Sequence, residues 1–187
     1  MRIPRIFLPF CPAKVFSAVV IILMLLILPA HAAPISKFVG EYTGSASVVS
    51  ADGSQPHRNM NVTITENKKG FTVKWTSTTI KSDGRVKEKS YSITFTPSDR
   101  DGIFAAAMEQ NLFGKSVQLD PMKGEPYVWG RIAGDTLTVF SLFVNDEGGY
   151  EMQQYDRTLA DGGLQLEFSL SRNGEELRSV SAFLERQ

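Results

Sequence analysis

Short turn motifs that combine Gly with Asp or Asn recur along the chain from residue 52 onward. These residues readily adopt the positive backbone φ angles that tight β-hairpin turns require. The motifs lie at 52–53, 67–70, 83–84, 99–102, 134–135, 146–149, 161–163 and 173–174. Because hairpin turns follow one another so regularly, the pattern predicts an antiparallel β-meander in which each strand pairs with the next.

The stretches between these turns alternate apolar and polar residues, which is the period of a β-strand. In 164–170, for example, Leu and Phe occupy every second position while Gln, Glu and Ser lie between them. We expect strands at 38–49, 60–66, 71–80, 86–96, 103–108, 127–132, 136–144, 149–159, 164–171 and 176–185. One face of each strand should line a core and the other should meet water, which is not the exterior of a lipid-facing barrel.

Two stretches depart from this alternation. Segment 136–144 carries apolar residues on both faces, so its second face could lie under a loop, a terminus or a partner subunit. Segment 105–113 has helical propensity and ends at Gly114. There we expect a short strand followed by one helical turn, which could act as a lid over an open end or serve only as a packed connection.

An open sheet of many short strands would leave its edge strands exposed, and closure removes those edges. The expected fold class is therefore all-β: an antiparallel up-and-down meander of about ten strands closed into a barrel, with one short helix or lid segment. Residues 33–187 are long enough to form this barrel as a single domain with its own core.

The first 32 residues have the pattern of a signal peptide. Basic residues precede an apolar run at 15–28, and Ala30 and Ala32 provide the small residues of a cleavage site. The run is shorter than the roughly 20 residues of a membrane-spanning helix. We expect cleavage after Ala32, a periplasmic or secreted location, and no stable membrane insertion of the mature domain.

Composition excludes several classes of function. The chain has 20 Lys and Arg and 20 Asp and Glu residues, and cleavage removes only basic ones, so the mature domain is slightly acidic. Without a basic run, nucleic acid is not an expected partner, and Lys87 and Lys89 are interpreted as a solvated strand face. The one cysteine, Cys11, lies in the predicted leader, so we expect no disulfide, no cysteine nucleophile and no structural zinc.

Catalysis has little support in the sequence. Beyond residue 32 the remaining histidine is His57, in a segment, 54–59, that resembles a turn. We therefore predict no catalytic residue, no metal site and no cofactor, although an enzyme is not excluded. Acidic residues at turns, such as Asp99 and Asp146, could bind calcium, but turn formation is their more common role.

Arginine and aromatic residues share a face in two strands. Trp129 and Arg131 lie on one face of the first, and Tyr155 and Arg157 lie on one face of the second. If these faces point inward, the arginines could hold the anionic headgroup of an otherwise apolar ligand. In the opposite arrangement Val128 and neighbouring apolar residues point inward, and the arginines pair with acids outside. The candidate ligand-binding residues are Trp75, Phe95, Trp129, Arg131, Tyr155 and Arg157.

Short motifs resemble those of known ligand-binding barrels. Gly40-Glu41-Tyr42 resembles the Gly-x-Trp opening of lipocalins and avidins, with Tyr in place of Trp. Tyr155-Asp156-Arg157 resembles, in reverse order, the Arg-x-Tyr carboxylate clamp of fatty-acid-binding proteins. The chain thus has an architectural resemblance to the calycin group, which implies a barrel that encloses a small hydrophobic molecule.

The function expected from these patterns is non-catalytic binding of a small apolar or amphipathic ligand inside an exported barrel. The alternative is an envelope interaction protein, such as an inhibitor or an assembly accessory, that docks through its loops or through an exposed strand. Strand 136–144 is the candidate surface for such a protein partner or for a homodimer.

Overall fold

The computed structural model describes residues 33–47, 49–50, 53, 56–80, 84–107, 109–110 and 116–187. The predicted signal peptide and Met108 lie outside these residues. Within the described part of the chain, no helix is long and apolar enough to span a membrane.

The described chain is a ten-strand antiparallel up-and-down barrel, as the turn pattern predicts. Each strand pairs with the next, and β1 also pairs with β13, where Tyr42 lies opposite Arg186 and closes the barrel. The strands are β1 (Gly40–Ser47), β3 (His57–Asn67), β4 (Gly70–Ile80), β5 (Val86–Pro97), β6 (Ile103–Ala107), β9 (Tyr127–Ala133), β10 (Thr136–Val144), β11 (Tyr150–Ala160), β12 (Gly163–Arg172) and β13 (Glu175–Arg186). The short β2 (Val49–Ser50) extends the pairing of β1 along β13 in the same register.

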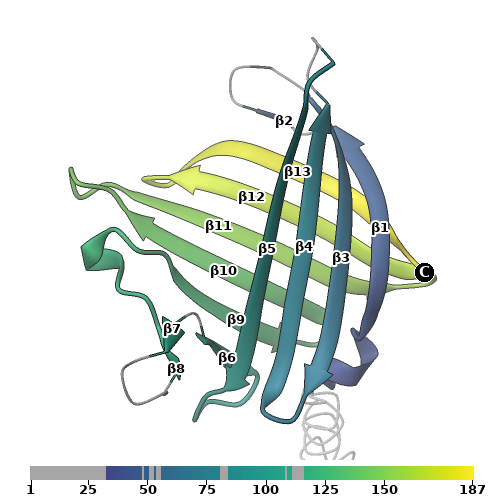
Figure 1. Ribbon diagram of the computed structural model, residues 1–187, viewed down its shortest axis with the longest axis horizontal. Helices are drawn as coiled ribbons and strands as arrows, with labels where there is room; N and C mark the ends of the chain where they lie inside the picture. The colour runs from purple at the N-terminus through teal and green to yellow at the C-terminus, as the bar shows by residue number, and fades with distance from the viewer. Residues whose placement is uncertain are drawn as a thin grey trace, which may run out of the picture. The chain divides into compact units, whose positions relative to one another are not determined.

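The barrel is flattened into two layers whose strands cross. Figure 1 shows β3, β4 and β5 running steeply across the front, while β9 to β12 pass behind them at a large angle. Side chains that point inward from both layers therefore face one another across the interior.

The seam between β1 and β13 depends on a glycine. A Cβ atom on Gly44 would lie 2.4 Å from the carbonyl oxygen of Phe183 and 2.7 Å from Cδ2 of Leu184. Because those distances are too short for any side chain, glycine allows the first and last strands to approach closely enough to close the barrel.

Strand boundaries agree with the sequence pattern to within a few residues, and β10 has the predicted bounds. The main correction concerns β3, which begins at His57 and not at residue 60, so His57 is an exposed strand residue and not part of a turn. The predicted helical turn at 105–113 is also corrected where the structure describes it, because Ala105 lies in β6 and Glu109–Gln110 forms β7.

The described part of the connection between β6 and β9 packs against the outside of the barrel. Strand β7 pairs with β8 (Ser116–Val117), and the 3-10 helix η2 (Pro121–Lys123) contacts β10. The side chain of Asp120 caps η2 by accepting a hydrogen bond of 3.0 Å from the backbone N–H of Met122. These contacts hold the described part of the connection against β6 and β10.

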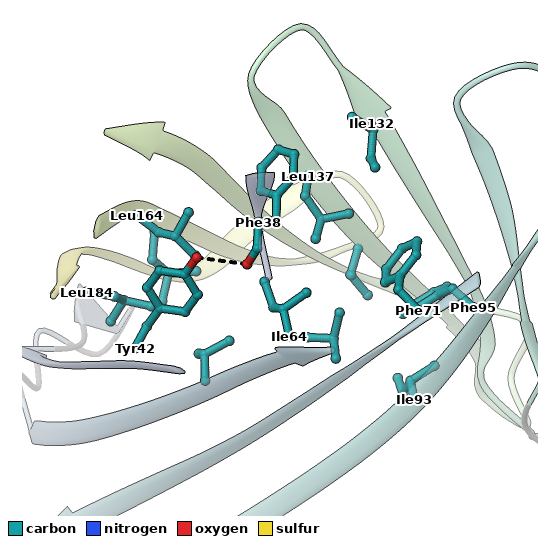
Figure 2. Close-up of a cluster of buried hydrophobic side chains, with 14 of the residues drawn as sticks. Phe38, Tyr42, Ile64, Phe71, Ile93, Phe95, Ile132, Leu137, Leu164 and Leu184 are labelled. Atoms are coloured by element: carbon teal, nitrogen blue, oxygen red, sulfur yellow. Dashed lines mark hydrogen bonds between the residues drawn. The ribbon is translucent and has the colours of Figure 1, made fainter. Parts of the chain in front are cut away.

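One half of the interior is filled with apolar side chains. Figure 2 shows Phe38, which follows the 3-10 helix η1 (Ile35–Lys37), among side chains from both layers. The residues of this cluster that are at most 1% exposed include Phe38, Tyr42, Ile64, Phe71, Val73, Phe95, Leu137, Val139, Leu164 and Leu184. Their burial supplies the hydrophobic stabilisation of a domain that lacks disulfides.

Hydrogen bonds hold the chain ends against this closed end. Tyr42 Oη donates to the carbonyl oxygen of Phe38 at 2.8 Å, drawn as the dashed line in Figure 2. Arg186 Nη2 lies 2.8 Å from the carbonyl oxygen of Val39, 3.1 Å from that of Lys37 and 2.7 Å from Tyr42 Oη. The buried Tyr42 thus links Phe38, near the start of the described residues, to Arg186 at the end of β13.

Candidate functional site

The other half of the barrel contains a cavity of about 540 Å³. It begins where the closed-end cluster stops, beyond Val62 and Leu166, and it opens toward the ends of β3, β4 and β5 that carry Arg58, Thr79 and Lys87. Its volume falls within the range of roughly 300–1,000 Å³ that is typical of small-molecule sites.

Aromatic side chains from four strands form one wall of the cavity. The ring of Trp75 on β4 stacks on Tyr91 of β5 at a centroid distance of 5.1 Å and meets Tyr155 of β11 at 5.5 Å. Tyr155 in turn lies 4.6 Å from the ring of Phe168 on β12. Alternation places these residues inward because each follows the parity of a buried neighbour, such as Val73 or Leu166.

Arg157 on β11 lies against this wall. It is 1% exposed, and its guanidinium carbon lies 5.5 Å from the ring centroid of Tyr155 and 5.7 Å from that of Trp75. Its Nε and Nη1 atoms are buried and have no hydrogen-bond partner. Burial lowers the pKa of Arg157 to about 10, although Tyr155 and Asp156 act in the opposite direction.

No carboxylate of the described residues lines the cavity beside this arginine. Asp156 is its chain neighbour but points to the outer face of the sheet, where it accepts hydrogen bonds of 2.6 Å from Thr138 Oγ1 and from Gln154 Nε2. Among the described residues that line the cavity, none is Asp or Glu. Arg157 is therefore a buried cation with unsatisfied donors, and it lines a cavity whose described residues include no acid, which is an arrangement suited to an anionic group.

Tyr155 supplies a hydroxyl group beside Arg157. Its Oη donates to Oε1 of Gln153 at 3.1 Å, and burial raises its pKa to about 12. The phenol therefore stays neutral at physiological pH and can donate or accept a hydrogen bond inside the cavity.

Further cationic residues line the cavity nearer its opening. Arg58 on β3 and Arg178 on β13 are partly buried, and the Nε atom of each is buried without a hydrogen-bond partner. Lys87 and Lys89 on β5 are exposed at the opening. The positive charge of the lining thus comes from four different strands.

The structure brings together three of the six predicted site residues. Trp75, Tyr155 and Arg157 line the cavity. Phe95 points inward but belongs to the filled half, where it is fully buried and lies 5.1 Å from the ring of Phe71.

Trp129 and Arg131 point out of the barrel, so the opposite arrangement holds for β9. Trp129 stacks on Phe140 of β10 at 4.7 Å, and Arg131 lies over the same Phe140 ring. The inward positions of β9 are Val128, Gly130 and Ile132, all buried. A Cβ atom on Gly130 would lie 3.3 Å from Phe95 Cδ1, so the small residue leaves room for a ring from the opposite layer.

Sequence reasoning missed Arg58 and Arg178. Each continues the inward parity of its strand, Arg58 with Met60 and Val62, and Arg178 with Val180. Extending the alternation to the strand ends would have identified them, but Arg58 was assigned to a turn. Lys87 and Lys89 likewise share the inward parity of Tyr91, although they are solvated as predicted.

A second depression, of about 690 Å³, lies on the outside of the barrel near the seam between β1 and β13. Its lining is mainly Thr, Ser and Asn side chains that point outward from β1, β3 and β4, together with Glu185. Since none of these side chains has a buried polar atom without a partner, we do not consider it a binding site.

Over the described ranges, no group of three or more His, Cys, Asp or Glu residues is placed to hold a metal ion. His57 is exposed at the start of β3.

Comparison with known proteins identifies the fold but no family. No protein-family description and no curated protein matches the sequence. Among solved structures, a protein of unknown function from the DUF3598 family of Nostoc punctiforme aligns with a TM-score of 0.51 and 14% identity, over 84% of this chain. The match covers 50% of that structure, so this chain spans about half of its length.

Two weaker structural matches were found. An S-type phycobiliprotein lyase, CpeS, from Guillardia theta has a TM-score of 0.37 and 9% identity, covering 82% of this chain and 90% of the lyase. A putative AttH from Nitrosomonas europaea has a TM-score of 0.28 and 12% identity, and the match covers 86% of this chain and 56% of that structure. The likeness to the DUF3598 structure concerns the fold alone and agrees with the antiparallel barrel topology.

Proposed function

We propose that this protein is an exported, non-catalytic binding protein that holds a small amphipathic molecule in the hollow half of its barrel, with an acidic headgroup of the ligand against Arg157. The observation that carries the proposal is the unpartnered guanidinium of Arg157, which is 1% exposed in a cavity lined by no described carboxylate. A buried charge without a partner is costly, and a bound anion would offset that cost through charge-assisted hydrogen bonds.

The remainder of the cavity suits an apolar ligand body. Trp75, Tyr91 and Phe168 present ring surfaces, and Met60, Leu166 and Leu170 add aliphatic surface. Burying apolar surface against such walls contributes roughly 25 cal/mol for each Å² removed from water. The cavity thus combines an apolar wall with a cationic group, which is the chemistry of an acidic amphiphile.

Docking through β10 has less support. The second face of this strand is already partly covered, because η2 contacts β10 and Phe140 stacks on Trp129. The expectation of export rests on the first 32 residues alone, and it is retained here as part of the proposal.

The test is native mass spectrometry of the full protein expressed in and recovered from its natural host. We expect a stoichiometric extra mass that is lost on denaturation, and organic extraction should yield an acidic amphiphile. Arg157→Gln should be recovered without that mass. Arg131→Gln is the matched control, since Arg131 lies on the outer face, and it should retain the ligand.

A ligand-free mass for the wild-type protein would contradict the proposal. So would a neutral or cationic ligand, or a ligand retained unchanged by Arg157→Gln. A dimer peak without any ligand would favour docking through β10 instead.

A further inference from the structure

The cavity contains more positive charge than one acidic group can neutralise. Besides Arg157, it is lined by Arg58 from β3 and Arg178 from β13. Both arginines point inward by strand alternation, since Arg58 shares the parity of the buried Val62 and Arg178 that of the buried Val180. They approach the interior from strands on opposite sides of β1.

Arg58 and Arg178 line the same cavity with charges of the same sign. Burial lowers the pKa of Arg58, and the charge of Arg178 lowers it further. The Nε atom of each guanidinium is buried without an acceptor, although the rest of each side chain is partly exposed. The uncomplexed protein therefore holds two like charges together with unsatisfied donors, an arrangement that an additional negative charge would relieve.

The charges of all three arginines act on Tyr155. Beyond burial, which raises the pKa of Tyr155, Arg157, Arg58 and Arg178 all act to lower it. All three arginines also line the same cavity, where Arg157 is 1% exposed and Arg58 and Arg178 are partly exposed. The positive charge of three side chains from three strands therefore belongs to one cavity.

We infer that the ligand headgroup carries at least two negative charges, one held by Arg157 and another by Arg58 and Arg178. This inference rests on the proposed function and specifies the ligand class: a phosphate monoester or a dicarboxylate at one end of an apolar body. A single carboxylate has two oxygen atoms and one charge, so it would leave two of the three guanidinium groups that line the cavity without a counterion. A dianionic headgroup supplies both the second charge and the additional acceptors.

The lysines at the opening fit the same ligand class. Lys87 and Lys89 lie on β5 where the cavity meets solvent, and both are exposed. Exposed charges of one sign beside a cleft accelerate the association of oppositely charged ligands, and this effect weakens with salt. They complete a gradient of positive charge from solvent to Arg157.

The test is isothermal titration calorimetry of the full protein, stripped of bound lipid, with four probes that share a twelve-carbon chain. The probes are dodecanol, dodecanoate, dodecyl phosphate and dodecylsuccinate, titrated at pH 8, where the phosphate is dianionic. We expect both dianions to bind at least about tenfold more tightly than dodecanoate, since one added charged hydrogen bond contributes about 1.5–3 kcal/mol. Dodecanol should bind most weakly.

Substitutions assign the two charges to different arginines. Arg58→Gln and Arg178→Gln should each reduce the affinity for the dianions about tenfold and leave the affinity for dodecanoate unchanged. Arg157→Gln should lower the affinity for all three anions, and Arg131→Gln on the outer face should leave all three affinities unchanged. Circular dichroism and thermal melts establish that each variant is folded.

The possible outcomes separate the two proposals. Equal affinity for dodecanoate and the dianions would overturn the inference that the headgroup carries a second negative charge. So would an Arg58→Gln variant that loses affinity for dodecanoate and for the dianions equally. Either result leaves the proposed binding function in place. Failure of every probe to bind the folded wild-type protein overturns both. A preference for dodecyl phosphate over dodecylsuccinate, or the reverse, identifies which dianion the site accepts.

Discussion

The guanidinium carbon of Arg157 lies 5.5 Å from the ring centroid of Tyr155, inside a cavity whose described lining includes no carboxylate. At the opposite end of the interior, Arg186 lies 5.3 Å from the ring of Tyr42, but its Nη2 atom has three oxygen acceptors. Two Arg–Tyr pairs of similar geometry thus differ in whether the cation is satisfied. That difference supports a structural role for the Arg186–Tyr42 pair and the binding role that we propose for the Arg157–Tyr155 pair.

Replacing Arg157 with Met should stabilise the ligand-free protein. The substitution removes a buried charge that has no partner and leaves an apolar side chain beside Trp75, so we expect the free energy of unfolding to rise by about 1–4 kcal/mol. Urea denaturation of ligand-free samples measures this change, with Arg131→Met as the control. A clear loss of stability would show that contacts with the two rings outweigh the cost of burying the charge.

Replacing Arg186 with Met should have the opposite effect. Its Nη2 atom interacts with the carbonyl oxygens of Lys37 and Val39, and losing a charged donor should lower the free energy of unfolding by about 1–3 kcal/mol. The matched control is Arg172→Met, which breaks only a surface ion pair with Glu151 and should cost about 0–1 kcal/mol. Equal effects of both substitutions in urea denaturation would argue against the anchoring role of Arg186.

Anion binding should weaken as the pH rises through about 10. The pKa of Arg157 is lowered to about 10, so above that pH the free protein loses the charge that binds the headgroup. Titration calorimetry with dodecyl phosphate between pH 8 and pH 11 should show a constant affinity followed by a loss of up to about tenfold per pH unit. The same profile in a Lys87→Gln, Lys89→Gln double variant would assign the loss to the arginine, whereas an unchanged affinity at pH 11 would count against the assignment.

Tyr155 should lose its proton at a higher pH than an ordinary tyrosine. Burial raises its pKa to about 12, so the difference in phenolate absorbance between wild type and Tyr155→Phe should be a single transition near pH 12, with folding monitored by circular dichroism. Between its ordinary pKa of about 10 and this value, the unfolded chain loses the proton first, and stability falls with rising pH by about 2–3 kcal/mol. Arg157 contributes with the opposite sign in the same range, because its folded pKa is lowered. The stability comparison is therefore made in an Arg157→Met background, and a transition near pH 10 would contradict the burial argument.

The sequence by itself determined the strands and their order. Turn residues with access to positive φ, such as Gly102, Gly134 and Gly162, separate segments whose side chains alternate, and both signals are local. The bounds of β10 followed from Gly134-Asp135 before it and the turn at 146–149 after it. When each strand pairs with the next, the order of the strands along the chain is enough to predict a barrel.

Tertiary structure decided which face of β9 lies inside. Trp129 and Arg131 alternate with Val128, Gly130 and Ile132, so both faces of the strand were plausible from the sequence. The choice depends on the opposite layer, where Phe95 occupies the space above Gly130, a contact between residues far apart in the chain. Periodicity describes one strand at a time and therefore does not contain that information.

Tertiary structure also decided that the interior is filled at one end and hollow at the other. Phe38 and the cluster around it fill the closed half, while Arg58, Arg157 and Arg178 meet in the hollow half from three different strands. The sequence shows each arginine as an isolated residue on a strand. Only the closure of β1 on β13 brings the three arginines to one cavity. Charge repulsion and desolvation depend on distances through space and not along the chain, so the sequence does not show these interactions.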